Sequence, residues 1–386
     1  MSNEQPLPVV LVGARGHGRW HLRNLRRLAA RGTVTLAGVC ELRPLSAEEL
    51  GEGLGSPEQG SDLGELLERT GARIVIICTP IHTHADLALT AAKAGAHILL
   101  EKPPAPSLAE FRRMTDGIAA AGVACQIGFQ SLGSHAVPWI RATLAGGAIG
   151  RIRGFGAAGA WVREEAYWQR APWGGLRRTP DGRDVVDGVL TNPLAHAVAT
   201  ALRLAEADRE TDIAGVGLEL YRVNDIAADD TSSARMTTTD GTPVVTAVTL
   251  AAEQPGEPYV EVHGSTGRIT FWYKQDRVLL ERDGAEPEYS TYDRTDLLEN
   301  LIAHLRDADV PLLVPPERTG GFMRLVEAVR TAPEPAALPA SAWHSEPAEH
   351  GPRRVLDGID ALTAAGARQL ALYSELGASW AGSTTR

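Results

Sequence analysis

The chain has 386 residues, of which 44% are hydrophobic and 22% are charged, and its net charge is −10. That composition is typical of a folded globular protein, and the length predicts two domains. No basic tract, secretory pattern or apolar run of about 20 residues occurs, so we expect no nucleic acid partner, no membrane partner and a cytoplasmic location.

The first part of the chain is predicted to alternate between short apolar strands and helices. Such alternation is typical of an α/β domain with a doubly wound parallel sheet, the Rossmann arrangement. We assign this domain to residues 1–128. Its expected strands are residues 9–12, 34–40, 74–78, 96–100 and 123–128, and its expected helices start near 19 and cover 63–70, 86–94 and 108–121.

The second part, residues 129–377, lacks this alternation. Its runs of alternating polar and apolar residues predict a large, mostly antiparallel sheet with one face covered by helices. We expect an exposed loop over 331–352, a final helix over 355–373 and a C-terminal tail at 378–386. The alternating runs are residues 151–156, 215–223, 233–239, 244–250, 259–263 and 268–273.

The first predicted strand runs into a glycine-rich turn that is followed by a helix. Gly13 and Gly18 occupy the outer positions of the dinucleotide fingerprint Gly-x-Gly-x-x-Gly, but Arg15 occupies the middle one. We predict that the segment from Gly13 to Gly18, with Gly16 and His17, binds a pyrophosphate at a helix N-terminus. Arg15 would either place its guanidinium on a phosphate or mark a turn that serves packing alone.

An acidic residue, Glu41, follows the second strand. It lies about 20 residues past the glycine-rich turn, where an acid binds the ribose hydroxyls of NAD. Because an acid repels the additional phosphate of NADP, the sequence favours NAD. Arg43 would offset that repulsion, so NADP stays possible.

Lys102 is one of three lysines in an arginine-rich chain, and it follows a predicted buried strand. The carboxyl ends of strands are where open α/β sheets bind ligands. A primary amine can pass a proton, whereas a guanidinium stays charged. Lys102 is therefore a candidate catalytic residue, and the alternative is an ordinary surface lysine before a proline-rich loop.

These pieces together resemble the glucose–fructose oxidoreductase / inositol dehydrogenase family of NAD(P)-dependent enzymes. The resemblance implies a Rossmann domain and an α/β domain whose open antiparallel sheet pairs subunits into a homodimer or homotetramer. It is carried by residues 13–18 with His21, by 78–84, by Glu101-Lys102-Pro103, by Trp173-Gly174-Gly175 and by 187–196.

The resemblance implies hydride transfer between nicotinamide and a CH–OH or C=O carbon of a sugar, amino sugar or cyclitol. It places Thr79, Pro80, His84, Glu101 and Lys102 at the cofactor, with Lys102 also at the reacting hydroxyl.

A second family motif has an aspartate four residues before a histidine. Here the spacing gives Asn192 and His196, so the carboxylate is missing. We predict that Asn192 and His196 form a catalytic pair, in which His196 assists proton transfer and Asn192 keeps the hydrogen bonding of the missing aspartate without its charge. Asn192 also suits the N-cap of the helix that carries His196, and the alternative is a structural cap with a histidine on the helix surface. Asp187 is a candidate for the missing carboxylate, or a plain loop acid.

Aromatic residues cluster with arginines shortly before this motif. Indole and phenol rings stack on sugar faces and guanidinium groups bind hydroxyls, so we predict a substrate site that includes Asn192 and His196. The alternative is a buried aromatic pair beside a solvated arginine face. The other predicted substrate residues are Tyr167, Trp168, Trp173 and Arg177.

Histidines and three cysteines occur without convincing metal-ligand spacing, so we predict no metal. Two other functions stay open. One is redox-neutral elimination or hydrolysis of a sugar, with transient oxidation by bound NAD. The other is a nucleotide-binding regulator without catalysis, which the loss of the carboxylate at Asn192 would fit.

Overall fold

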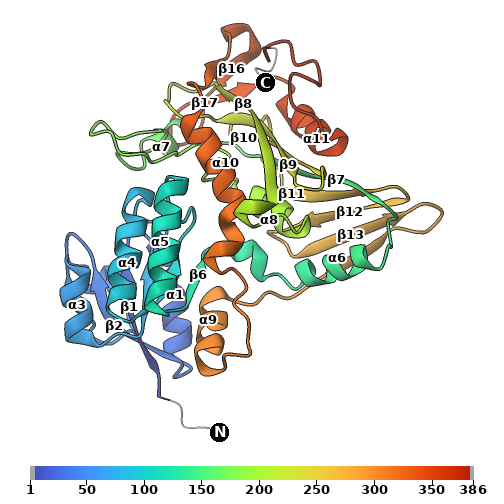
Figure 1. Ribbon diagram of the computed structural model, residues 1–386. Coiled ribbons are helices and arrows are strands. Elements are labelled where there is room, and N and C mark those ends of the chain that lie inside the picture. The colour runs from blue at the N-terminus through green and yellow to red at the C-terminus, as the bar shows by residue number, and fades with distance from the viewer. Residues whose placement is uncertain (1–4, 383–386) are drawn as a thin grey trace. The chain divides into compact units, whose positions relative to one another are not determined.

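The computed structural model describes residues 5–382 and divides the chain into two compact units. The first unit comprises residues up to 105, 109–128 and 297–316, and the second comprises 106–108, 129–296 and 317 onward. The chain leaves the first unit after residue 128. It later returns through helix α9 (Leu297–Arg306), which the sequence did not reveal (Figure 1).

The first unit is built on a six-stranded sheet whose neighbouring strands are all parallel. Its order, β3-β2-β1-β4-β5-β6, is that of the doubly wound dinucleotide-binding fold, as predicted. The short β3 was not among the expected strands and lies between the strand expected at 34–40 and the helix expected at 63–70. The strands are β1 (Leu7–Val12), β2 (Val34–Cys40), β3 (Glu58–Gly60), β4 (Ile74–Ile77), β5 (His97–Leu100) and β6 (Cys125–Ile127).

The helices of this unit pack through apolar positions spaced three or four residues apart. In α1 (Gly18–Ala29), for example, His21, Leu22, Leu25 and Leu28 are buried. The other helices are α2 (Ala47–Leu50), α3 (Leu63–Thr70), α4 (His84–Lys93) and α5 (Leu108–Ala121).

The second unit contains a nine-stranded sheet of order β14-β13-β12-β11-β7-β10-β9-β8-β15. The β7–β10 and β8–β15 pairs are parallel and the others are antiparallel, so the sheet is mostly antiparallel, as predicted. Its strands are β7 (Ile152–Ala160), β8 (Ile213–Arg222), β9 (Thr231–Thr238), β10 (Pro243–Thr249), β11 (Tyr259–Gly264), β12 (Gly267–Trp272), β13 (Arg277–Arg282), β14 (Glu288–Thr291) and β15 (Ala336–Ala337).

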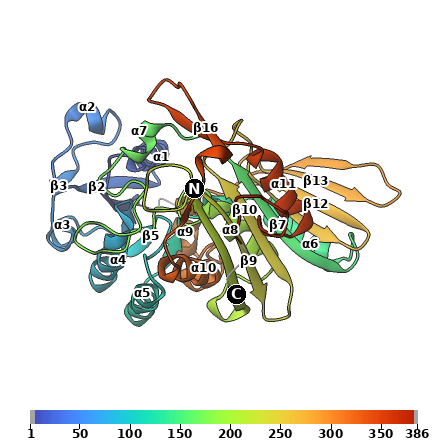
Figure 2. The ribbon, with the colours of Figure 1, turned by 90° about the horizontal axis from the view of Figure 1, so that it is seen from above.

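Helical segments cover both faces of this sheet near its centre, which corrects the expectation of one covered face. Residues three apart in a strand point to opposite faces. A Cβ added to Gly156 would meet the backbone of Ala367 in α11 (Ile359–Gln369). A Cβ added to Gly159 would instead meet Leu194, next to α8 (Ala195–Leu204). Figure 2 shows α11 alongside β7 and β10.

The C-terminal part is more structured than predicted. The expected loop at 331–352 contains β15 and β16 (Trp343–Glu346), and β16 pairs with β17 (Arg353–Leu356) in a hairpin. The final helix is shorter than expected because Leu370 ends it with a positive φ of 55°. In the expected tail, Trp380 packs edge-on against Tyr221 and Tyr373, and 383–386 lie outside the described residues.

The second unit also holds α6 (Ala136–Ala145), α7 (Glu165–Trp168) and α10 (Gly320–Thr331). Between residues 5 and 382, none of the helices is both long enough and apolar enough to cross a membrane.

Candidate functional site

The carboxyl ends of the parallel strands bring the predicted cofactor segments to one edge of the first sheet. The N–H of Cys78, just after β4, donates to Val12 O at the end of β1 over 2.8 Å. The N–H of Glu101, just after β5, donates to Ile77 O over 2.9 Å. The glycine-rich turn, the Thr79-Pro80 segment and Glu101 therefore share the edge at which such sheets bind ligands.

The outer glycines of the turn are required by packing. Gly13 has a φ of +81°, and a Cβ there would lie 2.5 Å from Cys78 O. A Cβ on Gly18 would lie 1.9 Å from Gly13 O. Gly16 has open space around it but a φ of +60°, which also favours glycine. The turn thus delivers the chain directly into α1, at whose N-terminus the helix dipole favours an anion.

Arg15 is engaged with protein groups. Its guanidinium forms two hydrogen bonds with Glu49, of 2.8 and 3.0 Å, and donates to the carbonyl oxygens of Arg43 and Pro44. Hydrogen bonding with Arg15 lowers the pKa of Glu49 to about 2. The proposed contact of Arg15 with a phosphate would require this ion pair to open.

Glu49 was not among the predicted site residues, although the sequence carries a signal for its place. Ser46 and Glu49 have the spacing of a capping box, and the structure shows both of its hydrogen bonds at the start of α2. The box fixes the Glu49 carboxylate at the N-terminus of a helix. It does not predict which cation meets that carboxylate.

Glu41 reaches back to the glycine-rich turn. Its Oε1 accepts hydrogen bonds from the N–H groups of Ala14, at 2.7 Å, and Arg15, at 3.2 Å. The acid therefore lies beside the turn, where a ribose-binding carboxylate is expected. The side chain of Arg43 is exposed.

His84 links two predicted cofactor segments. Its ring nitrogens lie 2.8 Å from the carbonyl oxygens of Thr79 and Pro103, and the side chain is buried. Burial lowers the pKa of this imidazole. The Thr79 and Thr83 hydroxyls are 2.6 Å apart. His84 therefore positions the segments around it.

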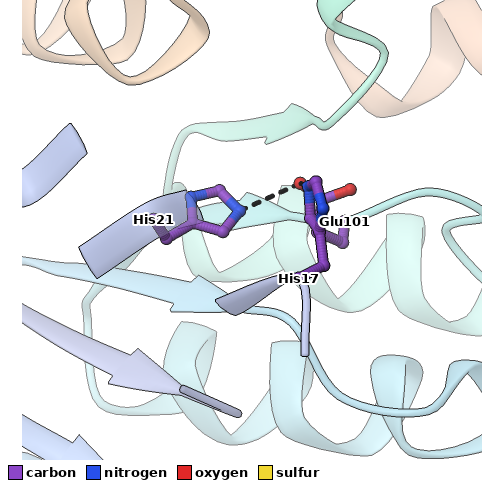
Figure 3. A group of neighbouring side chains, drawn as sticks. All are labelled: His17, His21 and Glu101. Atoms are coloured by element: carbon purple, nitrogen blue, oxygen red, sulfur yellow. Dashed lines mark hydrogen bonds and ion pairs between the residues drawn. The ribbon is translucent and has the colours of Figure 1, made fainter. Parts of the chain in front are cut away.

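Two histidines converge on Glu101 (Figure 3). His21 Nε2 lies 2.9 Å and His17 Nε2 lies 3.4 Å from Glu101 Oε1. Burial opposes ionisation of Glu101, but the hydrogen bonds with His17 and His21 outweigh it and hold the pKa of the carboxyl well below its usual range. The same hydrogen bond raises the pKa of His17. A carboxylate is thus maintained immediately before Lys102.

These three side chains could also be considered as metal ligands, since their ligand atoms lie within 4.8 Å of one another. A metal-bound histidine almost always donates its second ring nitrogen to a partner. His21 Nδ1 is buried and has no hydrogen-bond partner within the described part of the chain. We therefore interpret His17, His21 and Glu101 as a hydrogen-bonded cluster.

Lys102 is half-buried and follows Glu101 at the end of β5, and its peptide bond to Pro103 is cis. Its backbone N–H lies 3.3 Å from Glu101 Oε2. Lys102 thus lies at the ligand-binding edge, with its backbone N–H beside the Glu101 carboxylate.

In the second unit, Asn192 donates to Asp187 Oδ1 over 2.6 Å. Asp187 is buried and also accepts from Arg170, at 2.6 and 2.7 Å, and from the N–H of Gly175, at 2.7 Å. Asp187 does therefore lie beside Asn192. Each of the two Asp187 oxygens accepts two hydrogen bonds, so this carboxylate has a structural role in holding the segments around it.

Asn192 does not cap α8, which corrects the expectation that it is the N-cap of this helix. The helix begins at Ala195 with Leu194 in the capping position, and no side chain caps it. The residues before it form turns instead, so the side chain of Asn192 is directed to Asp187.

His196 lies in the first turn of α8 and its Nδ1 is 3.2 Å from Ser131 Oγ. Thr200, one turn later, donates to the same hydroxyl oxygen over 3.0 Å. The imidazole also packs edge-on against Phe129. Ser131, which the sequence did not single out, therefore holds the ring by a hydrogen bond at Nδ1.

The predicted aromatic–arginine cluster exists, with Arg170 at its centre. The Arg170 guanidinium lies 4.0 Å from the ring centre of Tyr167 and 4.8 Å from that of Trp173. Arg163 lies over Tyr167 at 4.8 Å. Trp168 packs edge-on against Tyr167 and beside Gly175.

Arg177 has a different role from the one predicted. Its guanidinium donates to the carbonyl oxygens of Ala332 and Pro333 over 2.8 Å each, and to Val329. These carbonyls lie at and beyond the C-terminus of α10, where a cation is favourable. We therefore remove Arg177 from the substrate-binding set.

Comparison with known proteins agrees with this geometry. Residues 7–129 match the model of an oxidoreductase family with an NAD-binding Rossmann fold. The first unit is thus a nicotinamide-dinucleotide-binding Rossmann domain. Over these residues the match agrees with the resemblance to the glucose–fructose oxidoreductase / inositol dehydrogenase family.

Curated relatives match mainly the same region. A scyllo-inositol 2-dehydrogenase (NAD(+)) from Bacillus subtilis is 31% identical over 150 residues, which are 38% of this chain and 43% of the relative. A levoglucosan dehydrogenase from Pseudarthrobacter phenanthrenivorans is 32% identical over 117 residues, which are 30% of each chain. The matches thus span less than half the length of these relatives.

Solved structures extend the likeness of fold to most of the chain. A 3-ketoreductase from Actinomadura kijaniata, solved with NADP and TDP-benzene, has a TM-score of 0.71 and 22% identity over 87% of this chain and 100% of its own. The WlbA dehydrogenase from Bordetella pertussis, solved with NADH and UDP-GlcNAcA, has a TM-score of 0.69 and 19% identity over 84% of this chain and 95% of its own.

Proposed function

We propose that this protein is an NAD(P)-dependent oxidoreductase that transfers a hydride between nicotinamide and a CH–OH or C=O carbon of a sugar, amino sugar or cyclitol. The observation that carries the proposal is Lys102 at the carboxyl edge of a doubly wound sheet, directly after the buried Glu101 carboxylate. The relatives named as inositol and levoglucosan dehydrogenases support the substrate class.

The glycine-rich turn and the N-terminus of α1 would hold the pyrophosphate of the dinucleotide, which supplies or accepts the hydride when bound. Glu41 beside the turn would bind ribose hydroxyls and favour NAD over NADP. His84 would fix the Thr79-Pro80 segment against the Lys102-Pro103 segment.

Lys102 and His196 would assist the transfer of the hydroxyl proton. An ammonium stabilises the negative charge that develops on a deprotonating oxygen, and a histidine exchanges protons near neutral pH. Ser131 would orient His196 through Nδ1, which directs Nε2 to the exchange. This replaces the orientation that an aspartate at position 192 would give.

The test is substitution of Lys102 by Met, with Lys93 replaced by Met as the matched control. Lys93 is an exposed lysine in the last turn of α4, so the control removes one charge from the same unit. We expect Lys102→Met to lower kcat/KM for an oxidised sugar or cyclitol at least 100-fold, a typical effect of losing an acid/base group. Thermal unfolding should be unchanged. Near-normal turnover in this variant would refute the proposal.

Consumption of the nucleotide separates this reaction from a redox-neutral one. A dehydrogenase converts one dinucleotide per product, whereas elimination or hydrolysis with transient oxidation returns the hydride to the same molecule. We expect one NAD(P)H formed per oxidised sugar. Product formation without net change in absorbance at the nicotinamide band would favour the redox-neutral reaction.

We also propose a homo-oligomer formed through the C-terminal sheet. Helix α11 packs mainly on β7, β10 and β11, and β14 carries Tyr289 with 67% of its surface exposed. We expect light scattering to give the mass of a dimer or tetramer, and Tyr289→Asp to reduce it. A monomer in the unsubstituted protein would rule this out.

A further inference from the structure

A cavity of about 770 Å³ lies within the second unit, and Trp168 is the one predicted site residue among those that line it. Four segments line it: α7 with the loop that follows it, the connection between β8 and β9, Glu334, and the β16–β17 hairpin. Its size falls in the range of roughly 300–1,000 Å³ that is typical of small-ligand sites.

The walls of this cavity are tied together by backbone hydrogen bonds. The N–H groups of Glu165 and Ala166, in and next to the lining, donate to hairpin carbonyls over 3.0 and 3.1 Å. On the other side, the N–H groups of Ala227 and Ala228 donate to Gly175 O over 3.0 and 2.9 Å. The segments are separated in sequence, so these bonds fix the cavity as a feature of the folded unit.

Two indole rings contribute to the lining, from Trp168 and Trp343. The guanidinium of Arg354 lies 4.6 Å from the ring centre of Trp343. Such rings offer flat apolar faces, and the polar groups around them offer hydrogen bonds at their edges. This combination suits a ring that is apolar on its faces and hydroxylated at its rim, which is the chemistry of a pyranose or furanose.

The arginines of the lining retain donors for a ligand. Arg354 uses Nη1 on Val223 O, at 2.5 Å, and Arg222 uses Nη1 on Ile226 O, at 2.9 Å. Within residues 5–382, the Arg222 guanidinium also lies 4.0 Å from the Asp225 carboxylate. The two guanidinium groups make no other polar contact in this part of the chain. Each guanidinium has five N–H donors, so most of them stay available.

The charge of the lining argues against an anionic ligand. Arg222 and Arg354 face three carboxylates in the same lining, those of Glu165, Asp225 and Glu334. A phosphate or diphosphate would meet a net negative wall. Hydroxyl groups, which both donate and accept, can use arginine and carboxylate side chains together.

The cavity is connected to the segment that carries His196. Gly175 lines the cavity, and its N–H donates to Asp187, which also accepts from Asn192 just before α8. One wall of the cavity and the start of the histidine-bearing helix are therefore held by the same carboxylate.

We propose that this cavity binds a neutral glycosyl unit, the non-reacting ring of a glycoside or disaccharide whose other ring is oxidised. The proposal rests on the proposed function for the reacting ring. The cavity itself adds the recognition of a second sugar, which makes the preferred substrate a glycoside and not a free monosaccharide.

Binding and turnover together test it. Isothermal titration with maltose, cellobiose and sucrose is compared with titration by glucose and UDP-glucose, in the unsubstituted protein with NAD bound. We expect one disaccharide to bind about tenfold or more tightly than glucose, a difference typical of one well-packed aromatic contact. Its kcat/KM should exceed that of glucose by a similar factor.

The variants Trp343→Ala and Arg222→Gln should abolish the preference for the disaccharide while leaving the kcat/KM for glucose within about twofold. If loss of the Trp343 indole destabilises the C-terminal packing, Arg222→Gln alone provides the test. Trp272→Ala, in β12 and outside the lining, is the control and should retain the preference.

Equal binding of glucose and every disaccharide would overturn this inference and leave the proposed function intact. A preference for UDP-glucose that the variants abolish would also overturn it, because the occupant would then be a nucleotide. Absence of turnover with all sugars would refute the proposed function alone. The titrations would then still decide whether the cavity binds a glycosyl unit.

Discussion

Asn192 Nδ2 and Asp187 Oδ1 are 2.6 Å apart, and this contact is one of four hydrogen bonds that the buried carboxylate accepts. A carboxylate at position 192 would bring a second negative charge against the first. The asparagine therefore suits its surroundings, although it departs from the family motif.

Asn192→Asp should accordingly destabilise the protein, by roughly 1–3 kcal/mol at pH 8, because it replaces a half-buried donor by a charge of the same sign as that of Asp187. The neighbouring carboxylate would raise the pKa of the carboxyl group introduced at position 192. Its destabilising effect is then present above that raised pKa and shrinks as the pH falls through it, when the protonated acid can donate again. Thermal unfolding between pH 5 and 8 checks this. A more stable and more active variant would contradict it.

Ser131→Ala tests how His196 is oriented. The variant removes the hydroxyl that lies 3.2 Å from Nδ1 and leaves Thr200 without its acceptor. Losing one hydrogen bond of about 0.5–1.5 kcal/mol should lower kcat roughly two- to tenfold. Because Ser131 acts through the histidine, the pH profile of kcat should shift as well.

Thr200→Val is the matched control, because it affects the hydrogen bond between Thr200 and Ser131 and leaves the one between Ser131 and His196 in place. It removes the donor to Ser131 and keeps the shape of the side chain. We expect a smaller decrease in kcat and no change in KM. An effect on stability with an unchanged pH profile in both variants would show that Ser131 and Thr200 are structural only.

The fold of the first unit could be predicted from the sequence because the patterns that specify its strands are local. Buried parallel strands are continuous apolar runs, and each candidate residue that follows such a run comes to the same edge of the sheet. Glu41 and Lys102 were predicted in this way, whereas Thr79 and Glu101 were predicted from the family resemblance. The short β3 was missed because its three residues, Glu-Gln-Gly, carry no apolar pattern.

The second unit was less predictable because its contacts join distant segments. The bond between Ser131 and His196 spans 65 positions, and no local pattern links a serine to a histidine at that separation. The role of Arg177 was mispredicted for the same reason. Its position among aromatic residues favoured a substrate role, whereas its partners come from the end of α10, 150 or more residues later.

The His17–Glu101 pair should make part of the stability depend on pH. The pKa of His17 is raised in the folded protein, so its interaction with Glu101 is fully present below the unfolded value of about 6.5 and is lost as the pH rises through the folded value. NMR titration should give His17 a pKa above 6.5. Glu101→Gln should return it to about 6.5, and an unchanged value would exclude the interaction.

Variants of Arg15 and Glu49 test the role of Arg15, which occupies the middle position of the dinucleotide fingerprint. If Arg15 can leave Glu49 for a phosphate, Glu49→Ala should tighten NAD binding and Arg15→Ala should weaken it, each by a few-fold, as measured by fluorescence titration. If the ion pair only supports the loop, both variants should weaken binding. Raising the salt concentration should reduce the effect of Glu49→Ala, because both groups are exposed.

Gly156→Ala should separate α11 from the sheet. The added Cβ would lie 2.0 Å from Ala367 O, a backbone atom that cannot move without the helix. Overpacking of this kind typically costs about 1–3 kcal/mol. Gly215→Ala in β8 is the control, because no atom lies within 4 Å of its added Cβ. Urea unfolding should show a loss of stability for Gly156→Ala alone, and equal midpoints for the two variants would mean that α11 is not firmly seated on β7.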